Sequence, residues 1–154
     1  MVELLLVIIL LGIVSAIAAV PVMEGARAYI SAEVRTDLTS QGRLAIERMA
    51  REVRTVRSRT AADLPGCCSA ATLSFIDMAG NTITYSSDGV NILRNGTPLA
   101  SASAVSLTFL YYQPDGITAA TVATQVWAIQ IDMTATRSGE THAFRIRTHP
   151  RNFV

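Results

Sequence analysis

The chain has 154 residues, a formal net charge of +1 and a hydrophobic fraction of 50%. This length fits one modest domain in addition to a long N-terminal helix. A net charge this close to zero excludes a protein that attracts nucleic acid or acidic partners through an overall positive field.

The most informative feature is an apolar run from Leu4 to Met23, which directly follows the acidic residue Glu3. This run is called the apolar segment below. It contains twenty residues without a charge, and twenty helical residues reach about 30 Å, the thickness of the hydrocarbon core of a bilayer. A carboxylate at the end of such a helix is costly in lipid unless it reaches the interface or finds a cationic partner. The run also lacks the basic start of a cleavable signal peptide. We therefore predict a membrane-spanning helix over residues 1–25.

Helical patterning continues beyond the apolar segment to about Arg59. From Ala26 onward the apolar residues recur at helical spacing, which predicts an amphipathic helix over residues 26–59 with one buried stripe. The predicted stripe consists of Val34, Leu38, Ile46, Met49, Val53 and Val56.

The exposed side of this helix is rich in arginine. The spacing predicts i,i+4 ion pairs between Glu47 and Arg51 and between Arg48 and Glu52. The arginines from Arg43 to Arg59 are a possible contact for DNA phosphates, but acidic residues alternate with them and no aromatic residue lies among them. A solvated helix face is therefore the preferred interpretation, and nucleic acid is not an expected partner.

Both cysteines lie in a predicted loop over residues 60–71, where Pro65 and Gly66 indicate a turn. Cys67 and Cys68 are adjacent, so they can bond to each other, bond to another subunit or remain thiols. In an oxidising exterior, a disulfide of either kind is the favoured interpretation. Adjacent cysteines lack the spacing of a zinc or haem motif, so no metal site is expected.

After this loop the period of the apolar residues changes to two, which indicates β-strands. The predicted strands are Thr72–Asp77, Thr82–Tyr85, Val90–Leu93, Val105–Tyr112, Gln125–Thr136 and Thr141–Thr148. On the longest strand one face is expected to carry Trp127, Ile129, Ile131 and Met133, which together with Phe109 can cover the helix stripe. A helix followed by antiparallel strands predicts an α+β fold, with a β head over residues 60–154 and one globular domain over residues 26–154.

No catalytic constellation is recognisable. His142 and His149 stand outside any metal-ligand spacing, and there is no phosphate-binding glycine loop and no nucleophile-elbow serine. The sequence therefore predicts a protein that is not an enzyme and that needs no cofactor and no metal.

The predicted helix, which begins in membrane and ends in water, opens with the string Val2-Glu3-Leu4-Leu5-Leu6-Val7-Ile8-Ile9-Leu10-Leu11-Gly12-Ile13. This string resembles the N-terminal segment of type IV pilins and type II secretion pseudopilins. The resemblance is specific over residues 1–25. Glu3 matches the family's near-invariant glutamate, Gly12 its mid-helix glycine and Pro21 the proline that closes its hydrophobic half. The helix text from Gly42 to Glu52 and the C-terminal text from Ile146 to Phe153 resemble J-type minor pseudopilins and related minor pilins.

The resemblance implies a pilin fold and a role in assembly for Glu3, Gly12 and Pro21. Glu3 is expected to neutralise the N-terminal ammonium of a neighbouring subunit, because a charge in an apolar core is costly unless it is paired. The segment from Gly12 to Pro21 is expected to lose helical hydrogen bonds in the assembled state, since glycine and proline both weaken a helix.

The function expected from the resemblance is that of a structural subunit of a type IV pilus-like filament, a helical homo-oligomer. Its expected partners are the inner membrane before assembly, the pilus assembly machinery and a prepilin peptidase, and its final location is an extracellular pilus. Two alternatives stay open. One is a minor pilin or pseudopilin of a type II secretion system, in a periplasmic pseudopilus. The other is a bitopic protein that anchors a periplasmic binding domain in the membrane.

Overall fold

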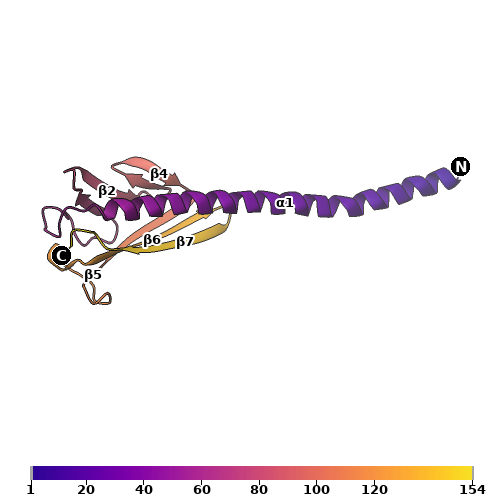
Figure 1. The fold of residues 1–154 in the computed structure, drawn as a ribbon. Helices are drawn as coiled ribbons and strands as arrows, with labels where there is room; N and C mark the ends of the chain where they lie inside the picture. Colours follow the sequence, from indigo (N-terminus) through magenta and orange to yellow (C-terminus); the bar gives the residue numbers. More distant parts are fainter. Residues whose placement is uncertain (1, 154) are drawn as a thin grey trace. The chain divides into compact units, whose positions relative to one another are not determined.

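A computed structural model describes residues 2–153. One long helix is followed by two antiparallel sheets, which confirms the predicted α+β fold (Figure 1). The elements in chain order are α1 (Val2–Val53), β1 (Leu73–Ile76), β2 (Thr82–Ser87), β3 (Asn91–Arg94), β4 (Thr97–Ser101), β5 (Ala104–Tyr112), the 3-10 helix η1 (Ala123–Gln125), β6 (Ala128–Arg137) and β7 (Glu140–Thr148).

The chain divides into two compact units, one that extends to Thr36 and one that begins at Asp37. The second unit is called the head below. Helix α1 contributes residues to both units.

Within the head, α1 buries one stripe of its surface. The buried residues are Leu38, Gly42, Ala45, Ile46, Met49, Ala50 and Val53. They recur at steps of three and four, so they share one face of the helix. Met49 and Val53 are completely inaccessible to solvent. The predicted stripe is thus confirmed within the head.

The helix ends six residues before the predicted Arg59, at Val53. Beyond this point the chain pairs with the start of the sheet region. Val56 forms an antiparallel bridge with Asp77, and the Arg57 amide donates to the Ile76 carbonyl at 2.9 Å. These partners replace the hydrogen bonds that another helical turn would supply.

The strands divide into a four-stranded sheet, in the order β1-β2-β3-β4, and a three-stranded sheet, in the order β5-β6-β7. All neighbouring strands are antiparallel. Asn95-Gly96 connects β3 to β4, and Ser138-Gly139 connects β6 to β7. Both pairs have positive φ at each residue, as the type I′ turn of a tight hairpin requires.

The head portion of α1 packs against both sheets. Leu38 lines one small cavity together with Ile92 of β3 and Ala135 of β6, and Gly42 lies against the ring of Phe144 on β7. The core beneath the helix contains alternate residues of β5 and β6, namely Val105, Leu107, Phe109, Tyr111, Ile129, Ile131 and Met133. The alternation predicted for these two strands is therefore confirmed.

Trp127 is an exception, and its predicted place on the core face is wrong. β6 begins only at Ala128, and the turn of η1, which ends at Gln125, interrupts the alternation. Val126 is fully buried instead. Trp127 is partly exposed and packs on His149, with 4.2 Å between the ring centroids.

Candidate membrane and assembly surface

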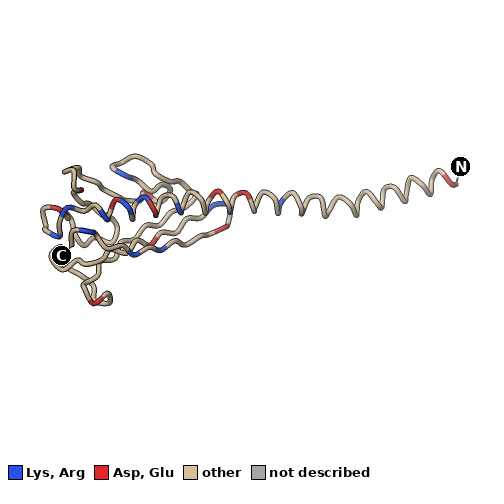
Figure 2. Tube along the Cα trace, in the orientation of Figure 1, with Lys and Arg blue, Asp and Glu red and all other residues tan. Residues whose placement is uncertain are grey.

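The apolar segment forms an exposed hydrophobic surface on the first part of α1. The most apolar window of the helix has a mean hydropathy of 2.9, and none of it is buried. By length and composition this helix is able to cross a membrane. Figure 2 shows the N-terminal part of α1 almost without charged residues. The large exposed side chains of the apolar segment are Leu4, Leu5, Leu6, Val7, Ile8, Ile9, Leu10, Leu11, Ile13, Val14, Ile17, Val20, Val22 and Met23.

The three predicted assembly residues all lie on this part of α1. Glu3 is in the first turn, and Pro21 lies inside the helix. Gly12 has open space where a side chain would begin. In the single chain the helix is continuous from Gly12 to Pro21. The expected loss of hydrogen bonds concerns the assembled state and stays a prediction.

The apolar segment contains one hydroxyl, that of Ser15. It donates to the carbonyl of Leu11 at 2.7 Å. This bond satisfies the hydroxyl within the helix, so the polar group adds little cost to burial in lipid or among other helices.

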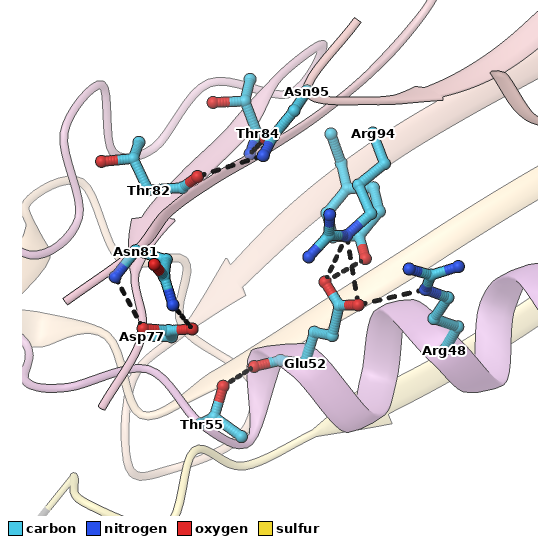
Figure 3. Close-up of polar contacts among 10 residues, drawn as sticks. Arg48, Glu52, Thr55, Asp77, Asn81, Thr82, Thr84, Arg94 and Asn95 are labelled. Atoms are coloured by element: carbon cyan, nitrogen blue, oxygen red, sulfur yellow. Dashed lines mark hydrogen bonds and ion pairs between the residues drawn. The ribbon is translucent and has the colours of Figure 1, made fainter. Parts of the chain in front are cut away.

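Within the head, the four-stranded sheet is held to the last turns of α1 through the carboxylate of Glu52 (Figure 3). Arg48 donates to it at 3.1 Å from the preceding turn, Arg94 at 2.8 Å from β3, and the Tyr85 hydroxyl at 2.7 Å from β2. Burial alone raises the pKa of Glu52, but these three hydrogen bonds outweigh it and lower the pKa below its ordinary value. The arrangement fixes the helix to two strands of the four-stranded sheet.

Only part of this cluster was predictable. The expected pair of Arg48 and Glu52 is confirmed. The expected pair of Glu47 and Arg51 is absent from the described residues, because an exposed ion pair gains too little to hold two long side chains in place. The contacts of Tyr85 and Arg94 with Glu52 carry no local sequence signal, since they connect residues far apart in the chain.

A second polar contact joins the beginning of the head portion of α1 to the three-stranded sheet. Arg137, at the end of β6, donates to the carboxylate of Asp37 and to the carbonyl of Ser101. Gln41 donates to the same carboxylate from the next turn of α1. Sequence reasoning missed this contact for the same reason.

Cys67 and Cys68 form a disulfide with each other in the loop between α1 and β1. Both are half-buried and pack against the core. The adjoining residues are tied to β5, because the Tyr111 hydroxyl donates to the Ser69 carbonyl and the Phe109 amide donates to the Ala70 carbonyl. The pair is therefore part of how this loop packs on the three-stranded sheet.

Among residues 2–153, no group of three or more histidine, cysteine or acidic side chains is arranged to hold a metal ion. His149 hydrogen-bonds the carbonyl of Trp127 through Nδ1. His142 lies half-buried on β7, with its ring centroid 6.5 Å from that of Phe144. The two histidines thus lie on different parts of the head surface.

The exposed apolar segment is therefore the best-defined candidate functional surface. Comparisons of the chain with protein-family models, with curated proteins and with solved structures find no match.

Proposed function

We propose that the chain is a structural subunit of a type IV pilus-like filament, assembled from a membrane through its N-terminal helix. One observation carries the proposal: a single helix has a completely exposed apolar part and a part that buries its stripe beneath the head. The head buries the apolar stripe of its own part of α1, whereas the side chains of the apolar segment are exposed and need a partner to cover them.

The size of the exposed apolar surface limits what that partner is. Burying one large apolar side chain contributes about 1.5–3 kcal/mol, so the exposed side chains of the apolar segment together represent on the order of tens of kcal/mol. A helix that is hydrophobic on all sides is covered only by lipid or by other helices of the same kind. A membrane before assembly and a bundle of copies after assembly meet this need in turn.

Glu3 has a specific role in this proposal. In the inner membrane its position in the first turn keeps the carboxylate close to the lipid headgroups. In the filament it pairs with the N-terminal ammonium of a neighbouring copy, so that neither charge is buried without a partner. A prepilin peptidase and the pilus assembly machinery are the partners that such a subunit requires, and the extracellular filament is its final location.

The proposal is tested in cells that produce the full chain together with a pilus assembly system. Filaments are sheared from the surface, counted by electron microscopy and compared with the membrane pool of the protein. We expect Glu3→Ala to remain in the membrane and to reduce filament yield sharply. Glu24→Ala is the matched control, because it removes a carboxylate from the same helix just outside the apolar segment.

Three other results would change the proposal. Normal filament yield from Glu3→Ala would remove the charge-neutralisation role. Short periplasmic filaments that depend on a type II secretion system would identify a pseudopilin. A wild-type chain that stays monomeric in the membrane would identify a permanently anchored protein.

A further inference from the structure

A groove lies beside α1 on the head. It has a volume of about 450 Å³ and is lined by Leu44, Ala45, Arg48, Arg51, Glu52 and Leu99. Leu44 is 69% exposed, although the next residue of the helix is buried. Leu99, on β4, is only partly buried. The groove thus offers apolar surface beside two guanidinium groups.

The two arginines of the groove differ in whether they form an ion pair within the chain. Arg48 donates to Glu52, so its charge is already balanced within the head (Figure 3). Arg51 is exposed and makes no ion pair with any of residues 2–153. A fitting occupant therefore presents an apolar side chain and one carboxylate to the groove.

The same chain carries such a surface between the apolar segment and the head. Tyr29 and Ile30 are 73% and 60% exposed. Glu33 follows them by four and three residues, so the three side chains share one face of α1. Glu33 is exposed and forms no ion pair within the described part of the chain. Glu24 is the less suitable acid, because its neighbour Met23 belongs to the apolar segment.

We propose that the groove of one copy binds the face formed by Tyr29, Ile30 and Glu33 of a second copy, with Glu33 paired to Arg51. A second copy is required because both residues lie on one continuous helix, and a helix cannot bring two of its own distant turns together. The apolar contact provides most of the affinity, and the ion pair sets the register between copies. This inference rests on the proposed filament, and it names a contact between subunits outside the apolar core.

The contact is tested by crosslinking two differently tagged full-length chains in the same membranes and filaments. One chain carries Glu33→Cys and the other carries Arg51→Cys, and a short bismaleimide joins thiols that lie close together. We expect a product that contains both tags. Replacing Arg51→Cys by Arg43→Cys, which is exposed on α1 but does not line the groove, is expected to abolish that product. Electron microscopy of the same preparations, and of the wild-type chain, reports whether filaments form.

Charge reversal provides a second measurement. Glu33→Arg and Arg51→Glu are each expected to lower filament yield several-fold, and the double variant is expected to restore it. Filaments without a product between positions 33 and 51 would overturn the groove contact and leave the filament intact. An equal product with Arg43→Cys would overturn it as well. Absence of filaments from the wild-type chain would refute the filament itself, and the groove contact with it.

Discussion

The hydroxyl of Tyr85 donates a 2.7 Å hydrogen bond to the carboxylate of Glu52 and so joins β2 to the last turns of α1. Tyr85 has no exposed surface. We predict that Tyr85→Phe, which removes only the hydroxyl, lowers the free energy of unfolding by about 1.5–3 kcal/mol, the usual range for a hydrogen bond to a charged group. Urea denaturation of the full chain in detergent measures this change. Tyr112→Phe is the control, since the Tyr112 ring packs under Arg147 and its hydroxyl has no hydrogen bond within residues 2–153. Equal losses in both variants would contradict the prediction.

The Glu52 carboxylate also predicts how stability depends on pH. Burial raises its pKa, but the hydrogen bonds from Arg94, Tyr85 and Arg48 lower it below the ordinary value. The folded state therefore binds this proton less readily than the unfolded state. The resulting stabilisation is present above the unfolded pKa of about 4.3 and is lost as the pH falls through the folded pKa.

Unfolding measured from neutral pH down to about pH 3 tests this dependence, since that range includes the ordinary pKa of glutamate. We expect the free energy of unfolding of the wild type to fall in acid, and that of Glu52→Gln to fall less. Asp63 contributes in the same direction, because a hydrogen bond from Arg57 lowers its pKa as well. The free energy of unfolding of Glu52→Gln should therefore still fall partly in acid. Identical profiles would show that Glu52 is not a source of it.

Two glycines of α1 are predicted to respond in opposite ways to the same substitution. A Cβ at Gly42 would overlap the ring of Phe144, whereas a Cβ at Gly25 would meet open space. Gly25→Ala should stabilise the helix by up to about 1 kcal/mol. Gly42→Ala should lower the free energy of unfolding of the head by about 1–3 kcal/mol, because overpacking outweighs the helical gain. Partial recovery in Gly42→Ala combined with Phe144→Leu would identify the ring as the cause, and stabilisation by Gly42→Ala alone would refute the clash.

The head is predicted to be soluble without the apolar segment. A chain starting at Ala26 retains the buried stripe of α1 and both sheets, and it loses the surface that needs lipid or other copies. We expect it to elute as a folded monomer in size-exclusion chromatography, while the full chain requires detergent or forms filaments. Polymerisation of the shortened chain, or a soluble monomeric full chain, would contradict the helix-core arrangement.

Local patterns made the helix and most strands predictable. The stripe containing Met49 and Val53 repeats at helical spacing, and Ile129, Ile131 and Met133 alternate along one strand. β4 escaped prediction because Thr97–Ser101 contains Pro98 and small residues, which carry little strand signal. Its pairing comes from the tight turn that returns the chain beside β3.

Features that depend on distant residues were not predictable. Phe153 is 2% exposed although it lies near the C-terminus, and the side-chain amide of the adjoining Asn152 donates to the Val56 carbonyl beyond the end of α1. The residue at which α1 ends and the hydrogen-bond partners of Glu52 were likewise not predictable from the sequence. Each is decided by which segments meet in the folded head, and sequence spacing reports only neighbours along the chain.

The two polar contacts of the head helix have a mechanical consequence. Asp37 is held by Arg137 at one end, and Glu52 is held by Arg94 at the other, about 22 Å apart at 1.5 Å per residue. Tension applied along α1 would pull the helix lengthwise across both sheets, so it would load both contacts and the stripe between them at the same time. Bonds strained together resist far more than bonds opened one after another, so the two contacts and the stripe would oppose such tension jointly.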